Sequence, residues 1–521
     1  MTNEEYELFI KSHPHIKRSD IRDMEDILSQ RMYGEMAFRA QNSEIEFLKN
    51  KALRAMGTDG EMKFSDIESG MLQASLSDGR QALKDILEKT PVEAPKCADG
   101  TKMKNQGRKK TIMTTLGAIE NVERTRYLDE ATKTNIYPLD IKIDLLEIEG
   151  RRSRYTNNFG QLSGEYYALM PERDVQRFLN KTLCIKLELD SIVRIGAAIA
   201  APHLPKLYDE AESDEAVQQQ VTMGEPGFIE KKIQDINISP ERDSIILNAL
   251  KKGVDGTERN RIETDLAIAY VEADGTGVSG LPHELSDKGK NGGPAKTFEV
   301  KIGVLFTQSF SDSGLPLLEK GRIFRDVGST RYMGTTEKIA QFTLQLDAFT
   351  RMNGIYDAQQ IVFLSDGAVW LEKLREKLFP RSIGVIDLFH ARQHLHELIE
   401  SFWFYGSNQK KAFYDKCAHL LDLGEIDQMI SLITQKITKY NKESVEKQLV
   451  YFISNKEKMR YGLFRAAGLF IGSGVVESAC KTIVENRLNG SGMRWTKKNA
   501  ANVVALRSAF YSGKNGNGAA A

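Results

Sequence analysis

The feature that most constrains the fold is an alternation of strand-length and helical segments after about residue 262. The strand-length runs are TDLAIAYVEAD, TFEVKIGVLFTQ, GRIFRDVGSTRYM, IVFLSD and SIGVIDLFH. Phe298, Val300, Ile302 and Val304 share one face of the second run, as alternation in a strand requires. IVFLSD is a run of apolar residues that ends in Ser365 and Asp366, which is typical of a buried parallel strand. Helical spacing separates the last three runs, so the sequence predicts an α/β domain.

The order of these segments is more specific than their class. Three antiparallel-looking strands, a helix, a strand, a helix and a final strand follow the order of a ribonuclease H-like fold. We therefore predict a ribonuclease H-like catalytic domain over 261–521, with an all-α insertion at about 391–470. Before it we predict a helical N-terminal region (1–95), a basic strand segment plus helix-turn-helix-like DNA-binding region (96–205) and an acidic linker (206–260).

Charge and cysteine usage exclude several classes of protein. The 521-residue chain carries 72 Lys+Arg and 72 Asp+Glu, so nucleic acid must be contacted through local basic patches rather than a basic field over the whole chain. The four cysteines form no Cys-x-x-Cys pair, which argues against a zinc ribbon or a disulfide framework. The sequence has no long apolar segment and its first residues lack an apolar core, so we expect a cytoplasmic protein without membrane contact.

Three carboxylates are the candidates for chemistry. Asp274 and Asp366 each close an apolar strand and precede glycine, and Glu477 lies at a glycine-rich helix start in GSGVVESACK. If these acids converge at one sheet edge, their oxygens suit Mg²⁺ or Mn²⁺, and a pair of such ions can drive phosphodiester chemistry. The alternative is that each aspartate only caps a turn, as Asp-Gly pairs often do.

A group of histidines lies near the fifth strand. His390, His394 and His396 invite a zinc site, since the first two share a helix face. However, HExxH is absent and no cysteine is near. We therefore favour a hydrogen bond from His390 to Asp387 or to a substrate phosphate, with a structural histidine as the alternative.

Two basic segments are candidate DNA contacts. The residues are Lys102, Lys104, Arg108, Lys109 and Lys110 in the first, and Arg487, Arg494, Trp495, Lys497 and Lys498 in the second. Cations would hold backbone phosphates, and the tryptophan would stack on a base or sugar. The alternatives are a solvated surface turn for the first segment and a core tryptophan with a solvated basic face for the second.

Several blocks of the sequence resemble a known family. EADGTGV, KTFEVKIGVLF, FLSDGAVWL, VIDLFHARQHL and GSGVVESACKTIVENRLNGSGMRW are similar to the catalytic region of ISKra-type bacterial insertion-sequence transposases, which are DDE recombinases. The resemblance implies that Asp274, Asp366 and Glu477 are the metal-binding triad. It matches Asp387 and His390 to an Asp-x-x-His signature of related enzymes. Cys97 stands alone where relatives often carry paired cysteines.

The predicted function is therefore that of a DNA transposase, an Mg²⁺-dependent enzyme of polynucleotidyl transfer. Water would cut a phosphodiester at the transposon end, and the freed 3′-hydroxyl would attack target DNA. Asp274 would bridge two ions, with Asp366 and Glu477 each completing one. The partners would be transposon ends, target DNA and at least one further copy of the chain. Two alternatives remain: a metal-dependent nuclease of the same fold, and a non-catalytic DNA-binding protein derived from a transposase.

Overall fold

The structure, a computed structural model, describes part of the chain. The described residues are 64–97, 100, 103–107, 109–128, 135–183, 185–206, 254–255, 268–285, 296–309, 317–319, 322–358, 360–401, 407–438 and 442–514. The chain divides into two compact units, one from Met1–Ser163 with Glu172–Ala198 and the other from Gly164–Pro171 with Ile199–Ala521. Most of the predicted N-terminal region and acidic linker lies outside the described residues.

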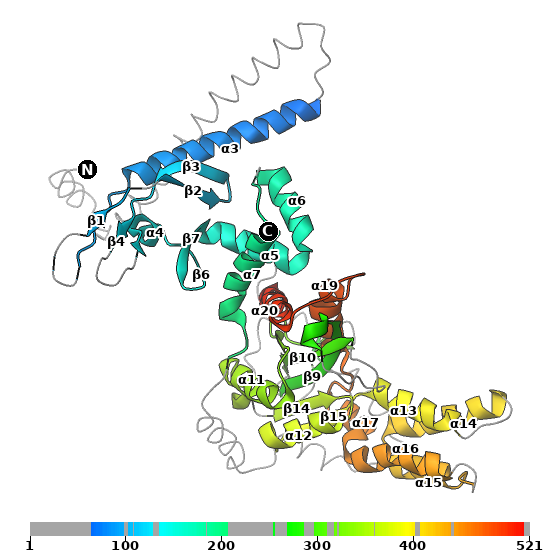
Figure 1. The fold of residues 1–521 in the computed structure, drawn as a ribbon. Coiled ribbons are helices and arrows are strands. Elements are labelled where there is room, and N and C mark those ends of the chain that lie inside the picture. The colour runs from blue at the N-terminus through cyan, green and yellow to red at the C-terminus, as the bar shows by residue number, and fades with distance from the viewer. Residues whose placement is uncertain are drawn as a thin grey trace, which may run out of the picture. The chain divides into compact units, whose positions relative to one another are not determined.

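The first unit combines a long helix with small sheets (Figure 1). Its elements are α3 (Phe64–Lys89), β1 (Lys104–Asn105), β2 (Lys109–Thr114), β3 (Gly117–Glu123), β4 (Tyr127–Leu128), β5 (Asn135–Ile136), α4 (Pro138–Lys142), β6 (Leu145–Ile148) and β7 (Arg151–Thr156). One sheet has the order β3-β2-β7-β6 and the other β1-β4-β5. Ile112, Ile119 and Leu145 are buried in the main sheet, and Leu83 and Leu87 of α3 pack against them. Apolar burial therefore fixes α3 on this sheet.

Three helices follow within the segment predicted to be helix-turn-helix-like. They are α5 (Asn157–Leu169), α6 (Glu172–Leu183) and α7 (Leu189–Ala200). Val175 and Leu179 are the buried side chains of α6, one helical turn apart.

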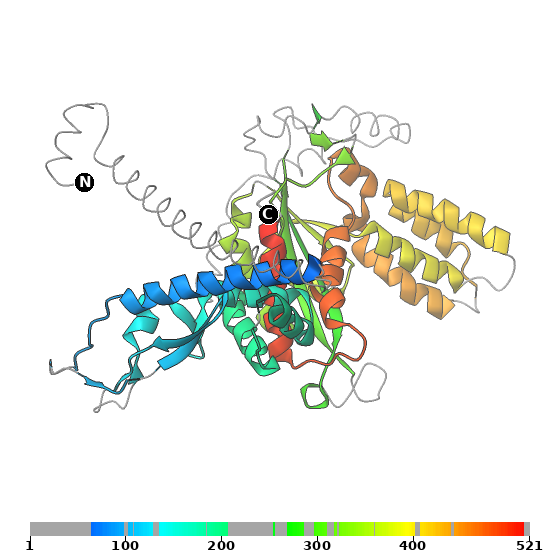
Figure 2. The same ribbon diagram turned by 90° about the horizontal axis from the view of Figure 1, so that it is seen from above.

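The second unit is built on a five-stranded mixed sheet (Figure 2). Its strands are β9 (Ile268–Ser279), β10 (Thr297–Gln308), β13 (Arg331–Thr335), β14 (Gln360–Ser365) and β15 (Ile383–Ile386), in the order β13-β10-β9-β14-β15. The first three strands along the chain pair antiparallel, whereas β14 runs parallel to both β9 and β15. A mixed α/β fold is thus confirmed. A small separate sheet has the order β12-β11-β8, from β8 (Val254–Asp255), β11 (Leu317–Glu319) and β12 (Arg322–Ile323).

Helices cover both faces of the large sheet. The helices α11 (Ile339–Met352) and α12 (Val369–Leu378) bury Phe342, Leu346 and Leu371 against the strands. On the other side α20 (Lys497–Lys514) packs on β13, where a Cβ at Gly334 would lie 2.3 Å from Val504 Cγ1. Each fully buried large apolar side chain contributes about 1.5–3 kcal/mol. This packing makes the central strands β9 and β14 a rigid support for residues at their ends.

The segment after β15 is a bundle of helices that projects from one end of the sheet (Figures 1 and 2). It contains α13 (Leu388–Glu400), α14 (Ser407–Leu423), α15 (Ile426–Thr434), α16 (Lys442–Asn455) and α17 (Tyr461–Ala466). The chain leaves and returns at one point, because the N–H of Leu388 donates to the carbonyl of Ile471 across 3.0 Å. It then forms α18 (Gly474–Ala479), a π-helical turn (Cys480–Glu485) and α19 (Asn486–Leu488).

One strand boundary was predicted wrongly. Asp274 was expected to end the first strand, but β9 continues to Ser279, paired throughout with β10. Gly275 makes no turn: a Cβ at this position would lie 2.5 Å from Glu299 Oε1 on the neighbouring strand. That oxygen is the end of an exposed, flexible side chain, which can move aside. Gly367 does turn the chain, with φ +91° directly after β14.

Candidate functional site

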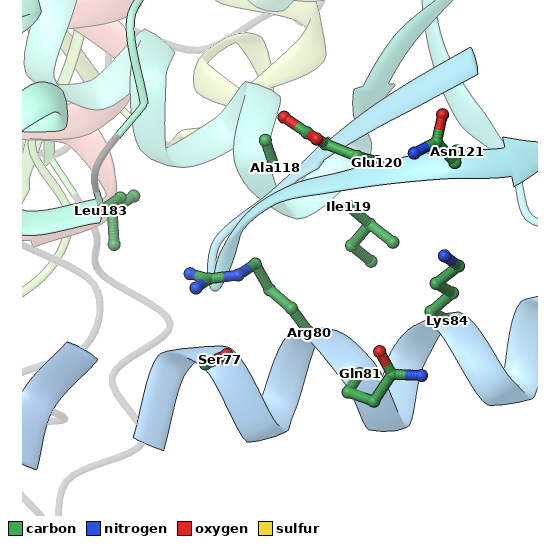
Figure 3. A pocket seen from close by; sticks show the side chains of 9 residues that line it. All are labelled: Ser77, Arg80, Gln81, Lys84, Ala118, Ile119, Glu120, Asn121 and Leu183. Atoms are coloured by element: carbon green, nitrogen blue, oxygen red, sulfur yellow. The ribbon is translucent and has the colours of Figure 1, made fainter. Parts of the chain in front are cut away.

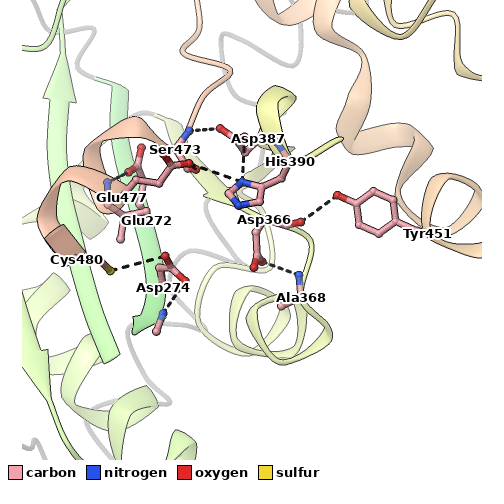
Figure 4. A network of polar contacts seen from close by, with 12 residues as sticks. Glu272, Asp274, Asp366, Ala368, Asp387, His390, Tyr451, Ser473, Glu477 and Cys480 are labelled. Carbon is pink, nitrogen blue, oxygen red and sulfur yellow. Dashed lines mark hydrogen bonds and ion pairs between the residues drawn. The ribbon is translucent and has the colours of Figure 1, made fainter. Parts of the chain in front are cut away.

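Two of the predicted acids lie on adjacent parallel strands. The register pairs Leu364 of β14 with Glu272 of β9. Two residues further along the same direction come Asp366 and Asp274, at the point where β14 ends and β9 continues alone beside β10. The carboxyl end of β14 therefore brings the two carboxylates side by side (Figure 4).

Asp274 is a partly buried carboxylate in a crowded acidic setting. Its Oδ1 accepts the N–H of Gly275 at 2.6 Å, and its Oδ2 lies 3.7 Å from the Cys480 sulfur, which donates to it. Burial raises the pKa of Asp274, and the nearby charge of Asp366 raises it further, against the hydrogen bonds and the charge of His390. The site therefore disfavours negative charge unless a cation compensates it.

Asp366 is held through its turn. Its Oδ1 accepts the N–H of Ala368 at 2.8 Å, and its backbone carbonyl accepts the hydroxyl of Tyr451 at 3.0 Å. Tyr451 belongs to α16 of the helical bundle, and its ring lies against that of His394, with centroids 4.0 Å apart. The bundle thus contacts the turn that carries this acid.

Asp387 connects three parts of the second unit. As the N-cap of α13 its Oδ1 accepts the backbone N–H of His390 at 2.7 Å and lies 3.1 Å from the same residue's Nδ1. Its Oδ2 accepts the N–H of Ser473 at 2.5 Å, just before α18. Burial alone raises the pKa of Asp387, but the hydrogen bonds from His390 and Ser473 outweigh it and lower this pKa overall. The carboxylate form is therefore favoured.

Glu477 lies with this pair. Its Oε1 is 3.8 Å from His390 Nδ1 and 3.3 Å from the hydroxyl of Ser473, which donates to it. Asp387, His390 and Glu477 each offer a ligand atom, and these atoms all lie within 4.8 Å of one another. Hydrogen bonding with Asp387 raises the pKa of His390, and the charges of Asp387, Asp366 and Glu477 add to this effect. A cationic imidazole is therefore favoured among the acids.

One acid at the site escaped sequence analysis. Glu272 is fully buried on β9, two residues before Asp274 and on the same face of the strand. Its Oε2 accepts the N–H of Val476 at 2.7 Å, whereas its Oε1 has no hydrogen-bond partner among the described residues. Burial raises the pKa of Glu272 to about 8. Through its bond to Val476, the buried carboxyl of Glu272 connects β9 to α18, the helix that carries Glu477.

The donor set fits a divalent metal ion. It offers several carboxylates, whose oxygens suit Mg²⁺ or Mn²⁺, and one imidazole that could bind a metal only in its neutral form. Burial is the main cause of the raised pKa of Asp274 and the charge of Asp366 adds to it, so a bound cation would stabilise the carboxylate form. Glu477 belongs both to the predicted triad and to the group that it forms with Asp387 and His390. It is the only residue common to the two, and it lies 3.8 Å from His390 Nδ1.

The predicted DNA contacts differ in exposure. Lys104, Arg494, Lys497 and Lys498 are exposed. Lys110 is half-buried, with its ammonium 5.1 Å from the ring centroid of Tyr137. Lys102 and Arg108 lie outside the described residues, as does the side chain of Lys109.

Two of the residues predicted to contact DNA, Arg487 and Trp495, are buried. Arg487 is 2% exposed and donates to the carbonyl of Tyr167 at 3.2 and 3.3 Å. Trp495 is 7% exposed, donates to the carbonyl of Leu488 at 3.0 Å, and its ring lies 5.0 Å from the Arg487 guanidinium. Both side chains are committed to internal contacts, so neither presents a surface to DNA. The alternative of a core tryptophan was the correct one.

A separate hollow lies in the first unit between α3 and β3 (Figure 3). Its volume is about 420 Å³, and Arg80, Lys84 and Glu120 are among its lining residues. The guanidinium of Arg80 is used internally, because it donates to the carbonyl of Leu116 at 3.0 Å. Lys84 and Glu120 carry opposite charges beside this hollow, so its lining does not favour an anion.

Comparisons with known proteins give little further information. No protein-family model and no curated protein matches the sequence. Among solved structures, the chain is similar to the Drosophila P element transposase strand transfer complex, at 9% sequence identity and a TM-score of 0.21. The match covers 72% of this chain and 83% of that chain. A TM-score this low carries no argument about function. None of the described helices is long and apolar enough to cross a membrane.

Proposed function

We propose that the protein is a metal-dependent enzyme of DNA phosphodiester chemistry, specifically a DDE transposase on a ribonuclease H-like core. The observation that carries the proposal is the register of β9 and β14, which sets Asp274 beside Asp366 at the carboxyl end of β14. The strand order β13-β10-β9-β14-β15 supports the choice of core, since it joins an antiparallel meander to two parallel strands. The motif blocks that resemble ISKra-type transposases favour a transposase over a nuclease.

In this proposal Asp274, Asp366 and Glu477 hold Mg²⁺ or Mn²⁺. When bound, divalent ions supply polarisation of the attacking hydroxyl and charge neutralisation at the leaving oxygen. The protein's own contribution is to fix the acids. Asp274 is held in a continuous strand, and Asp366 in a turn closed by Ala368 and Tyr451. Such preorganisation lowers the cost of arranging charge during the reaction.

His390 and Asp387 have a different role in the proposal. Asp387 Oδ1 accepts a hydrogen bond from Nδ1–H of a protonated His390. The second ring nitrogen, Nε2, is then a donor that can bind a phosphate oxygen beside the acids. The cation also balances negative charge among Asp366, Glu477 and Asp387, whose charges all raise its pKa.

Exposed cations near the sheet edge support contact with DNA. The backbone of Trp495 bonds to Ser279 and Leu281 at 3.0 Å each, so Arg494 and Lys497 lie beside the end of β9. The same strand carries Asp274. Phosphates on either side of a reacting bond would meet these cations, which makes binding dependent on salt.

The test uses the full chain and the DNA that flanks its gene. A labelled duplex of that DNA is incubated with Mg²⁺, with Mn²⁺ or with EDTA, and cleavage and joining to a plasmid are scored on gels. We expect metal-dependent cleavage and strand transfer, both lost in Asp274→Asn and Asp366→Asn. Glu376→Gln, at an exposed acid of α12, is the matched control and should retain activity.

Each contrary outcome has a distinct meaning. Undiminished cleavage by Asp274→Asn contradicts the site. Cleavage without joining of pre-cut ends favours the nuclease alternative. DNA binding with no reaction in either metal favours a non-catalytic protein.

A further inference from the structure

A second hollow in the first unit is rich in arginine. It has a volume of about 510 Å³ and lies between the β6–β7 hairpin and α7. Four of its lining residues are arginines, namely Arg151, Arg152, Arg154 and Arg194. All four belong to the unit without the acidic site. They lie within the 96–205 segment predicted to bind DNA, but none was among the individual residues predicted as DNA contacts. Three of the cations lie on β7 and the fourth lies on α7.

The hairpin is tightly constrained. Ile148 pairs with Arg151, so the turn contains only Glu149 and Gly150, with φ +52° and +73°. Two residues with positive φ are the mark of a type I′ turn, whose twist matches that of the strands. Glu149 also accepts a bond of 3.1 Å from Arg194 of α7, which ties the turn to the helix. The two-residue turn, more than this exposed ion pair, therefore orders the backbone that carries the arginines.

The four arginines differ in their acidic partners. Arg152 lies 2.8 Å from Asp144, and Arg194 pairs with Glu149. Arg151 and Arg154 are exposed and have no acidic partner within the part of the chain that the structure describes. Arg154 instead lies over the ring of Tyr155, 5.6 Å from its centroid. These two guanidinium groups are uncompensated cations on a fixed surface.

The lining indicates which ligand would bind. Ile148 and Tyr155 are its only large apolar members, and both are buried. A protein partner would need an exposed apolar anchor, which these residues do not supply. A polyanion needs only fixed cations, and guanidinium groups suit phosphate because they donate two parallel hydrogen bonds.

We propose that this hollow binds the phosphate backbone of DNA, with Arg151 and Arg154 as the contacting residues. The choice of DNA among polyanions rests on the proposed function. The contact is with the backbone, so it should hold DNA in register without reading its sequence.

The test measures binding by the full chain in EDTA, where no cleavage occurs. Fluorescence anisotropy of a labelled 30-base-pair duplex is followed over a series of salt concentrations, for wild type and Arg151→Gln/Arg154→Gln. Each phosphate contact contributes about 0.9 to the slope of log affinity against log salt. We expect the double variant to lower this slope by about 2, and Arg151→Lys/Arg154→Lys to restore most of it.

The control removes equal charge elsewhere in the unit. Arg173→Gln/Arg177→Gln alters two exposed arginines of α6 that do not line the hollow, and should leave the slope unchanged. An unchanged slope in the hairpin variant, or an equal loss in the α6 variant, overturns the proposal. So does an equal loss of affinity for polyglutamate, which would indicate an acidic-protein site. Asp274→Asn should bind normally here, so failure of this inference is separable from failure of the catalytic proposal.

Discussion

The hydroxyl of Tyr451 donates a hydrogen bond of 3.0 Å to the backbone carbonyl of Asp366. The two residues are 85 positions apart, one in the helical bundle and one at the end of β14. The next residue, Gly367, has φ +91°, and a Cβ there would lie 2.8 Å from the Tyr451 ring. The bundle therefore helps to set the turn that presents the acid.

Removal of this hydroxyl should weaken metal binding. In Tyr451→Phe the carbonyl of Asp366 loses its donor, at a cost of about 1 kcal/mol in the free energy of unfolding. We expect weaker Mn²⁺ binding by electron paramagnetic resonance, because the turn that holds Asp366 is less fixed. Tyr414→Phe, in α14 of the same bundle, is the matched control. Equal Mn²⁺ affinity in Tyr451→Phe and wild type would show that the contact is only structural.

A methyl group at position 367 should be destabilising for two separable reasons. Gly367→Ala places an L-residue at positive φ, which costs about 1 kcal/mol, and also drives its Cβ into the Tyr451 ring. Urea denaturation should show a loss of about 2–3 kcal/mol in the wild-type background. In a Tyr451→Ala background only the backbone part should remain. Identical losses in both backgrounds would contradict the steric contact.

The buried Glu272 should make stability depend on pH. Its pKa is 4.5 when unperturbed and about 8 in the fold, so the folded state binds more protons between these values. Stability from this group therefore falls as pH rises from about 4.5 to 8, by up to about 1.4 kcal/mol per pH unit, and levels off above. Glu272→Gln does not titrate. As the pH rises from about 4.5 to 8 in EDTA, the free energy of unfolding of Glu272→Gln should therefore increase relative to that of wild type. Denaturation at several pH values would measure this difference.

The pKa of His390 should depend on Asp387. The hydrogen bond between these side chains is the largest cause of its raised pKa. Asp387→Asn keeps an N-cap acceptor for α13 but removes the charge, so the pKa of His390 should fall. Nuclear magnetic resonance titration of the imidazole C–H signals in EDTA would measure it. Glu397→Gln, at an exposed acid of the same helix, should leave the His390 signal in place.

Loss of Arg487 should affect folding rather than DNA binding. Arg487→Ala removes two bonds to the carbonyl of Tyr167 and the contact with the Trp495 ring. We expect a loss of about 2–4 kcal/mol in the free energy of unfolding, measured in urea. At low temperature, where the variant is folded, its DNA affinity should equal that of wild type. A large loss of affinity without a loss of stability would restore the original prediction.

The strands could be predicted because their signal is local. Alternation in 297–308 and the apolar run before Asp366 each lie within one segment, and the Asp-Gly turn at 366–367 is read from two residues. The extension of β9 past Asp274 could not be predicted so easily. Glycine at 275 and 277 favours a loop, and only pairing with β10 keeps the segment extended.

Burial of charged residues depends on contacts that are remote in sequence. Glu272 is bound by Val476, 204 residues away, and Arg487 by Tyr167, 320 residues away. No local pattern distinguishes Arg487 from the exposed Arg494 a few positions later. The triad could be predicted from the positions of its acids at strand ends and a helix start, together with the family resemblance. The neighbours of each acid come only from the fold.

The π-helical turn Cys480–Glu485 separates Glu477 from the anchored end of its helix at Arg487. Arg507 bonds to the carbonyls of Thr482 and Ile483 within this wide turn and so holds it open. Each α-helical residue rotates the helix by about 100°. Deletion of one residue here, with every named side chain retained, would swing Glu477 away from His390. The number of residues in this turn therefore sets the direction in which Glu477 points from its helix, whatever the amino acids of the turn are.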